Sequence, residues 1–263
     1  MRIALFAHPG GRAFGVVEGP AGTDDPEALT IAEIEGVPFA GIQFTGERWA
    51  LADVQLLPPI LPSKVVGIGR NYAAHASELG NQVPSAPLLF LKPPTTVIGP
   101  GAPIRLPVDS KQVEHEAELA VVIGGKGARA VSREKAMESV FGYTCANDVT
   151  ARDQQRADIQ FTRAKGYDSF CPIGPWIETD LKYADVGVQA LVNDEVKQDG
   201  RTKDMIFDVP TLVSYVSHVM TLLPGDVILT GTPSGVGPIV AGDSVSVRIE
   251  GLGTLTNPVA NRA

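Results

Sequence analysis

The stretch EHEAELAVVIG, residues 114–124, decides which fold we expect for this chain. Glutamates occupy every second position at its start, Glu114, Glu116 and Glu118, and an apolar, β-branched run follows. Alternate side chains of a strand lie on one face of a sheet, so the three carboxylates are predicted to share a face. The apolar run predicts a buried strand. Because burial of charge is costly, the acidic start of such a strand needs an explanation.

Two arrangements would allow neighbouring carboxylates on a buried face: protonation, or a cation between them. Mg²⁺ and Mn²⁺ prefer oxygen ligands and would suit the second arrangement. The competing interpretation is a half-exposed edge strand whose acidic row is solvated. The pattern alone favours the edge strand, since most acidic side chains in proteins are solvated.

Two other clusters of residues favour a functional site over a solvated edge strand. CANDVTARD, residues 145–153, places Asp148 at the end of an apolar strand, where it can supply a third carboxylate. GRNYAAHASE, residues 69–78, places His75 and Glu78 three positions apart, and side chains at this spacing share a face of a helix. A carboxylate that orients a histidine is a general-base arrangement, although such a pair taken alone indicates a surface contact. We expect structural or solvated roles for the other histidines, His8, His115 and His218.

Length and composition limit the class of protein. The chain has 263 residues, enough for one large domain or for one main domain with a small appendage. The formal net charge is −8 and no basic run occurs, so we expect no nucleic-acid partner, and an anionic substrate would need a local concentration of positive charge. Every apolar run ends well short of the ~18 residues of a membrane span, so no membrane association is expected.

The N-terminal sequence and the cysteines predict a cytoplasmic protein. MRIALFAHPGG, residues 1–11, has one basic residue before a very short apolar run, which predicts a strand and a turn rather than a signal peptide. Cys145 and Cys171 do not have the spacing of a metal motif. We therefore expect two thiols in a reducing compartment.

The chain is predicted to divide at LPPILPSK, residues 57–64, because its three prolines exclude a helix or a central strand. Residues 1–60 are expected to form a small β-rich N-terminal domain, and residues 61–263 the main domain. Strand patterns outnumber helical ones and do not alternate regularly with them. This predicts a β-rich α+β fold with a mixed, rolled sheet rather than a doubly wound sheet.

Three segments have helical patterns with end signals. They are RNYAAHASELG (70–80), closed by Gly80, SREKAMESVF (132–141), with Ser132 as N-cap, and DVPTLVSYVSHVMTLL (208–223), with Asp208 as N-cap.

Two glycine-rich segments fail as nucleotide motifs. In GIGRNY, residues 67–72, Tyr72 occupies the position of the third glycine of the dinucleotide fingerprint. GTPSGVGP, residues 231–238, lacks the Gly-Lys-Ser/Thr ending of a phosphate-binding loop. Neither a nicotinamide cofactor nor ATP is therefore expected.

Six motifs, taken in order, resemble those of the fumarylacetoacetate hydrolase superfamily, and the resemblance covers about residues 63 to 258. The motifs are GRNYAAHASE, LLFLKP, HEAELAVVIG, NDVTARDQQ, RAKGYDSFCPIGPW and GTPSGVG. The chain is most similar to the short bacterial members, and its N-terminal unit resembles one found on some of them. The resemblance implies the β-rich roll of the family's C-terminal domain and a homodimer.

The resemblance also implies the residues of a site. It places Mg²⁺ or Mn²⁺ on Glu116, Glu118 and Asp148, and leaves Glu114 as a neighbour. It makes His75 and Glu78 a catalytic dyad and Lys165 an active-site lysine. Arg152, Gln155, Lys92 and Thr232 match the family's substrate-binding positions. Loop residues near Arg70, Gln82 and Tyr167 are expected to read the distal end of the substrate.

The activity that the resemblance implies is metal-dependent chemistry on a small anionic α-keto or enol dicarboxylic acid, through an enolate. The outcome expected first is that of a 2-hydroxyhepta-2,4-diene-1,7-dioate isomerase/decarboxylase or an oxaloacetate decarboxylase. The alternative within the family is an acylpyruvate or fumarylpyruvate carbon–carbon bond hydrolase. A non-catalytic metal- or ligand-binding homologue and a structural homo-oligomer without a site are the alternatives from other classes.

Overall fold

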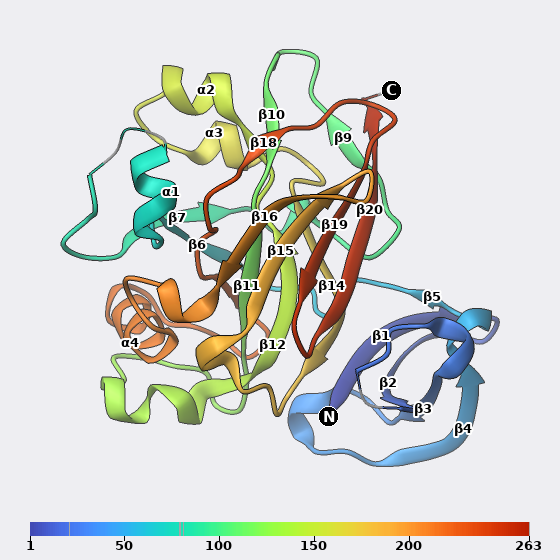
Figure 1. Cartoon of the computed structure of the whole chain (residues 1–263). Helices are drawn as coiled ribbons and strands as arrows, with labels where there is room; N and C mark the ends of the chain where they lie inside the picture. Colours follow the sequence, from blue (N-terminus) through green and yellow to red (C-terminus); the bar gives the residue numbers. More distant parts are fainter. Residues whose placement is uncertain (21, 79, 81, 263) are drawn as a thin grey trace.

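The structure is a computed structural model, and it describes residues 1–20, 22–78, 80 and 82–262 (Figure 1). Most of its regular structure is strand, arranged in a twelve-stranded sheet, a five-stranded sheet and a three-stranded sheet. Most neighbouring strands are antiparallel, but β6 (Val65–Gly69) and β17 (Val227–Leu229) are parallel. The predicted β-rich α+β fold with a mixed sheet is therefore confirmed.

The large sheet runs in the order β4-β3-β2-β1-β14-β12-β11-β17-β6-β7, with β5 beside β1 and β8 beside β14. Its further strands are β1 (Arg2–His8), β2 (Gly11–Glu18), β3 (Thr30–Ile34), β4 (Phe44–Ala50), β5 (Gln55–Leu56), β7 (Leu88–Lys92), β8 (Val97–Ile98), β11 (Ala117–Ile123), β12 (Val140–Asn147) and β14 (Cys171–Glu178).

The two smaller sheets have the orders β16-β15-β19-β20-β9 and β13-β10-β18. Their strands are β9 (Ile104–Leu106), β10 (Val113–His115), β13 (Thr150–Ala151), β15 (Gly187–Val192), β16 (Glu195–Arg201), β18 (Gly237–Pro238), β19 (Ser244–Ile249) and β20 (Gly253–Asn261). The α-helices are α1 (Ala73–Glu78), α2 (Arg152–Ala157), α3 (Thr162–Lys165) and α4 (Val209–Val219). Short 3-10 helices lie at Pro26–Ala28, Pro38–Ala40, Leu51–Asp53, Pro94–Thr96, Arg133–Ser139, Tyr183–Asp185 and Thr202–Asp204.

Strand β11 lies at the centre of the large sheet, between β12 and β17, and every one of its residues is buried. Leu119 and Val121 belong to the core on one face of the sheet, and Ala120 and Val122 belong to the core on the other. The apolar run is thus buried, as predicted, and the half-exposed edge strand that the acidic pattern alone favoured is wrong. Regular strand pairing is interrupted at Glu116, whose amide donates to the side-chain oxygen of Asn147 in β12 (3.0 Å).

Strands β1–β5 form the N-terminal unit, which lies to one side of the main body in Figure 1. Strand β1 pairs with β14 through Arg2 and Ile3, so the large sheet continues from the main body into this unit. Trp176 of β14 is buried in the apolar cluster of the unit, where Phe6 and Leu29 also lie. The N-terminal unit therefore shares both backbone hydrogen bonds and an apolar core with β14 of the main body.

The helix predictions are confirmed in two of three segments. Helix α4 begins after Asp208, whose carboxylate accepts a hydrogen bond from the Thr211 amide (3.0 Å). Beyond α1, Gly80 has a positive φ of 68° and its amide donates to the Ser77 carbonyl (3.0 Å). Among the described residues no helix is long and apolar enough to span a bilayer.

The predicted helix over 132–141 is wrong in type and length. Residues Arg133–Ser139 form a 3-10 helix, and the Ser132 side chain makes no capping hydrogen bond. Val140 already belongs to β12 and pairs with Ile123 of β11. Pairing with the central sheet therefore ends the helical turn early, which a local pattern of helix-forming residues does not reveal.

Candidate metal centre and active site

A cavity of about 450 Å³ lies where α1, α2 and α3 approach the ends of β10, β11 and β12. Its wall joins the motifs that are far apart in the sequence. The lining residues are Ile68, Gly69, Arg70, His75, Glu78, Phe90, Glu116, Glu118, Asp148, Arg152, Gln155, Arg156, Phe161, Lys165 and Thr232. The expected metal ligands, catalytic residues and substrate-binding residues are all among them except Lys92.

Three carboxylates converge on this cavity. Glu116 lies at the break between β10 and β11, Glu118 lies two residues further on, and Asp148 follows β12. Each offers one oxygen that lies within 4.8 Å of those of the other two, and all three side chains are buried. The Asp148 amide also donates to the Glu116 carbonyl (2.9 Å), so the backbone itself holds two of the carboxylates together.

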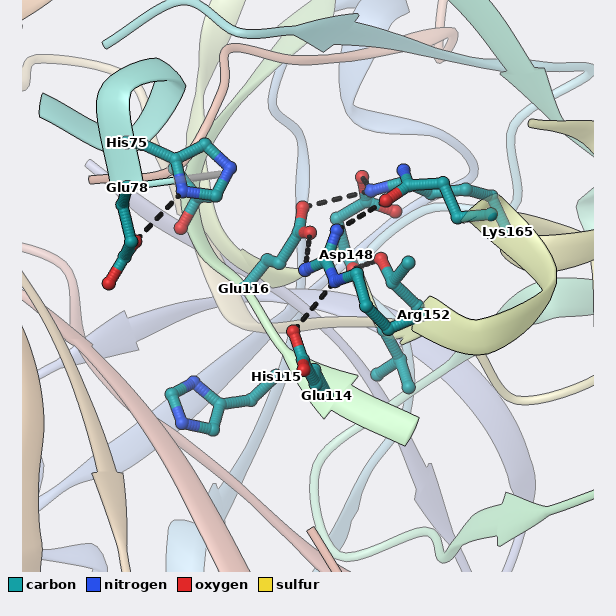
Figure 2. Close-up of polar contacts among 12 residues, drawn as sticks. His75, Glu78, Glu114, His115, Glu116, Asp148, Arg152 and Lys165 are labelled. Carbon is teal, nitrogen blue, oxygen red and sulfur yellow. Dashed lines mark hydrogen bonds and ion pairs between the residues drawn. The ribbon is translucent and has the colours of Figure 1, made fainter. Parts of the chain in front are cut away.

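Two cations from the helices above the sheet contact these carboxylates (Figure 2). The Nζ atom of Lys165, at the end of α3, lies 2.9 Å from Oε2 of Glu116 and 2.5 Å from Oδ2 of Asp148. A guanidinium nitrogen of Arg152, the first residue of α2, lies 2.5 Å from the other Glu116 oxygen. Lys165 also lies over the ring of Phe90, 4.9 Å from its centroid.

The carboxylates differ in their electrostatic environment. Burial alone would raise the pKa of Glu116, but the positive charges of Lys165 and Arg152 outweigh it and hold this pKa below its ordinary value. Burial raises the pKa of Glu118 well above its ordinary value, and the negative charges of Asp148 and Glu116 raise it further. Within the described part of the chain Glu118 has no ion pair, and it accepts a hydrogen bond from the Gly231 amide (2.6 Å).

The donor set fits a hard divalent cation. Carboxylate oxygens are the ligands that Mg²⁺ and Mn²⁺ prefer. The buried charges of the cluster are four carboxylates, those of Glu114, Glu116, Glu118 and Asp148, against three cations, those of Lys92, Arg152 and Lys165. One negative charge is formally left over among these seven groups.

His75 and Glu78 lie on α1, at another part of the cavity wall. The His75 Nδ1 atom lies 3.4 Å from Oε2 of Glu78, which is a long contact for a hydrogen bond. The amide of Gly235 donates to both oxygens of the Glu78 carboxylate, at 3.0 and 3.2 Å. In Figure 2, this pair lies on one side of Glu116 and Lys165 lies on the other.

Lys92 and Glu114 surround the carboxylate cluster without lining the cavity. The fully buried Lys92 ammonium lies 2.5 Å from Oδ1 of Asp148 and 3.3 Å from the Val149 carbonyl. The structure therefore places Lys92 behind Asp148 and not in the cavity wall. Glu114 accepts a hydrogen bond from Nε of Arg152 (2.7 Å), which agrees with its expected place as a neighbour of the set.

The remaining histidines lie outside the cavity wall. His115 is buried against Gln198, and burial lowers its pKa although the hydrogen bond to Gln198 opposes this. His8 packs on the ring of Trp49. In α4, the Nδ1 atom of His218 lies 2.8 Å from the Ser214 carbonyl.

The cavity wall also contains residues that the sequence patterns did not single out, Phe90, Arg156 and Phe161. Arg156 follows Arg152 by four positions in α2, and this helical spacing is the signal that could have revealed it. Arg70 lines the cavity as expected, whereas Gln82 and Tyr167 do not. The Tyr167 hydroxyl instead hydrogen-bonds Asp109 and Gln154.

Comparison with protein-family models matches residues 64–260 to the fumarylacetoacetate hydrolase C-terminal model. Residues 1–59 match a second model, described as Rv2993c-like, N-terminal. The fold is also found in a crystal structure of a 2-hydroxyhepta-2,4-diene-1,7-dioate isomerase from Mycobacterium marinum. That chain is 52% identical, with a TM-score of 0.93 over 100% of this chain and 99% of the other.

Two further relatives have different named activities. The mitochondrial oxaloacetate decarboxylase of Dictyostelium discoideum is 49% identical over 73% of this chain and 90% of its own length. The maleylpyruvate hydrolase of Sphingobium sp. SYK-6, solved with manganese(II) and pyruvate, is 34% identical, with a TM-score of 0.79 and complete coverage of both chains. The relatives are thus enzymes, but their reactions differ.

Proposed function

Because this chain belongs to the fumarylacetoacetate hydrolase family, we propose that it is a divalent-metal-dependent enzyme that acts on small α-keto or enol dicarboxylic acids through an enolate. The observation that carries the proposal is the convergence of Glu116, Glu118 and Asp148 on the cavity that His75 and Lys165 also line. A site that only bound a metal would need no histidine–carboxylate pair beside it.

Mg²⁺ or Mn²⁺ is the cation proposed for the three carboxylates. The manganese in the maleylpyruvate hydrolase structure supports this class of ion. When bound, such an ion supplies Lewis-acid stabilisation of negative charge on the oxygen atoms of a keto acid. The formal charge of the buried cluster would change from one negative to one positive, which favours an anionic substrate.

Lys165 and Arg152 are proposed to hold the keto-acid end of the substrate. Both are cationic, line the cavity and contact Glu116. Gln155 accepts a hydrogen bond from Arg152 (2.5 Å) and fixes the direction of its guanidinium group. The ammonium of Lys165 can stabilise an oxyanion that develops beside it, without any rearrangement of the protein.

His75 is proposed to move the proton. If Nδ1 donates its hydrogen to Glu78, then Nε2 is the basic nitrogen that can accept a proton from carbon or from water. Transfer of one proton between carbon and oxygen gives a keto–enol isomer. A substrate with a carboxylate β to the keto group can instead lose that carboxylate as carbon dioxide, without attack by water. The electron pair of the broken carbon–carbon bond then remains as the enolate of the shortened keto acid.

Two further cations in the cavity wall favour a dicarboxylic substrate. Arg70 and Arg156 line the cavity together with the carboxylate cluster, and within the described residues Arg70 forms no ion pair. They can receive a second carboxylate, as in oxaloacetate or a hydroxymuconate-type diacid. Together with the names of the isomerase and decarboxylase relatives, this supports an isomerase/decarboxylase or an oxaloacetate decarboxylase as the first candidate.

A carbon–carbon bond hydrolase is the second candidate, and the maleylpyruvate hydrolase relative favours it. In that reaction His75 would activate water against a distal carbonyl group. A non-catalytic homologue is the alternative of another class, and the complete set of His75, Glu78 and Lys165 in the cavity wall argues against it.

A product-resolved turnover assay tests the proposal. The protein is treated with chelator, given Mg²⁺ or Mn²⁺, and offered oxaloacetate, an acylpyruvate and a hydroxymuconate-type diacid in turn. Metal-dependent formation of an isomer, carbon dioxide or two carboxylic acid fragments identifies the reaction. Absence of turnover with all three, with the metal bound, would support the non-catalytic alternative.

A further inference from the structure

The GTPSGVG motif, which is not a nucleotide loop, contacts both parts of the proposed site. Its first half, Gly231–Gly235, follows β17 and is called the GTPSG loop below. The Gly231 amide donates to Oε2 of Glu118 (2.6 Å), and the Gly235 amide donates to both carboxylate oxygens of Glu78 (3.0 and 3.2 Å). One short loop therefore holds a carboxylate of the metal set and the carboxylate of the histidine pair.

The loop has little freedom to move with respect to its neighbours. Gly231 and Gly235 have φ angles of 97° and 96°, which side-chain-bearing residues rarely adopt. A Cβ atom at Gly231 would lie 2.7 Å from Cβ of Asn71, and one at Gly235 would lie 2.2 Å from the Lys197 carbonyl oxygen. Glycine is therefore required at both positions for the backbone to approach this closely.

Gln198 of β16 joins this loop to the strand of the metal carboxylates. Its side chain is buried, and its amide makes four hydrogen bonds. The oxygen accepts from the Ala117 amide (2.9 Å) and faces Nδ1 of His115 (3.1 Å), while the nitrogen donates to Oγ1 of Thr232 (2.7 Å) and to the Pro233 carbonyl (2.8 Å). Because the Ala117 amide can only donate, the orientation of the Gln198 amide is determined, and His115 carries its hydrogen on Nδ1.

These contacts lie on both sides of Glu116, a proposed metal ligand, in the chain. His115 and Ala117 are the two neighbours of Glu116 in the chain, so Gln198 is bonded to the residue on each side of it. Thr232 donates its hydroxyl hydrogen to the Ala117 carbonyl (2.8 Å) and lines the cavity. The buried amide thus lies between the strand that presents Glu116 and the loop that binds Glu118 and Glu78.

We infer that Gln198, which is not part of the cavity wall, is a positioning residue. It holds the GTPSG loop at a fixed position relative to the strand segment that carries Glu116 and Glu118. The loop amides then fix Glu118 and Glu78, and through Glu78 the ring of His75, relative to one another. The inference rests on the proposed function, because it assumes that the carboxylates and the histidine pair act on the same substrate.

The first test compares Gln198→Leu with Gln189→Leu, a matched change on the neighbouring strand β15, where the glutamine bonds Asp199 at the surface. Loss of a buried partner behind a metal site typically costs about 10- to 100-fold in activity or metal affinity, and we expect a loss of this size in kcat/KM for Gln198→Leu. Gln189→Leu should stay within about twofold of the wild type. A folded Gln198→Leu variant with wild-type kcat/KM would overturn the inference.

The second test acts on the other end of the loop and decides the question if Gln198→Leu does not fold. Gly235→Ala pushes the loop away from Lys197 and moves the amide that holds Glu78. We expect kcat to fall on the order of 10- to 100-fold, while KM and the affinity for Mn²⁺ do not change. Gly242→Ala is the control, since Gly242 has a φ of 98° and open space around its Cβ position. An unchanged kcat in Gly235→Ala contradicts the inference.

Amide hydrogen exchange separates this inference from the proposed function. If the wild type shows no metal-dependent turnover, the proposed function fails, and exchange of peptides that cover 231–235 still tests the role of Gln198. Faster exchange of this segment in Gln198→Leu than in Gln189→Leu supports the positioning role of Gln198. Equal exchange in the two variants overturns it.

Discussion

The Nζ atom of Lys165 lies 2.5 Å from Oδ2 of Asp148, although the two residues come from different elements, the end of α3 and the end of β12. The carboxylates of Asp148 and Glu116 raise the pKa of Lys165 despite its burial, which alone would lower it. The lysine therefore stays positively charged in the interior. A permanent cation beside a carboxylate cluster is suited to an oxyanion that forms during a reaction.

Replacement of this lysine should impair catalysis. We expect Lys165→Met to lower kcat by about 100-fold or more, because one donor to a developing oxyanion is lost. Steady-state turnover with saturating Mn²⁺ measures the effect. Lys126→Met, at an exposed turn, is the matched control. Equal kcat values for the two variants would remove Lys165 from the mechanism.

Replacement of the histidine should separate turnover from metal binding. His75→Ala is expected to lose about 100- to 10,000-fold in turnover, the usual contribution of a general acid or base, and to bind Mn²⁺ like the wild type. His218→Ala removes a histidine from the surface of α4 and should change neither property. Loss of metal binding in His75→Ala would show that His75 belongs to the metal site.

The glutamate of the same pair should act through its histidine. We expect Glu78→Gln to lower kcat less than His75→Ala does, because the neutral amide can still contact His75 and Gly235 but no longer supports a charged imidazole ring. The pH dependence of kcat in the two variants and the wild type checks this expectation. A Glu78→Gln variant with wild-type kcat at every pH would place Glu78 outside the mechanism.

The N-cap of α4 makes a pH-dependent contribution to stability. Burial would raise the pKa of Asp208, but hydrogen bonds from the Thr211 hydroxyl and amide and from Arg133 lower it below the ordinary value. A lowered carboxyl pKa stabilises the folded state above the ordinary pKa, and this contribution is lost as the pH falls through the lowered value. Asp208→Ala should therefore cost about 0.5–2 kcal/mol of unfolding free energy at neutral pH, and less in acid.

Urea unfolding at pH 7 and in the acid range measures this difference. Thr211→Val serves as a comparison, since it removes the hydroxyl bond to Asp208 but retains the amide bond. Its loss should be smaller than that of Asp208→Ala. A cost of Asp208→Ala that does not change with pH would exclude a charged cap.

Much of the fold and of the site followed from periodicity. The apolar, β-branched run after Glu118 predicted a buried strand, and β11 is buried along its whole length. The spacing of Glu114, Glu116 and Glu118 also suggested one acidic row. It did not reveal that Arg152 binds Glu114 and Glu116 while Glu118, among the described residues, accepts a hydrogen bond only from the Gly231 amide. Those neighbours come from other elements.

Contacts between distant segments account for what the sequence did not reveal. Gln198 lies about eighty positions from Ala117 and belongs to none of the motifs, so the sequence gave no sign of its link to the acidic strand. Lys92 matched a pocket position by resemblance, but its ammonium lies behind Asp148. Three expectations stay predictions: the domain boundary at residue 60, the homodimer and the cytoplasmic location. Light scattering of the purified protein tests the homodimer.

Titration of the chelator-treated protein with Mn²⁺, comparing the wild type with Glu118→Gln and Glu114→Gln, tests whether the three carboxylates hold a metal ion. We expect one tight site in the wild type and in Glu114→Gln, because Glu114 binds Arg152 and lies outside the set of three carboxylates. Glu118→Gln should weaken binding by about 100-fold or abolish it. Equal binding by all three proteins, or no binding by the wild type, would contradict the proposed metal centre.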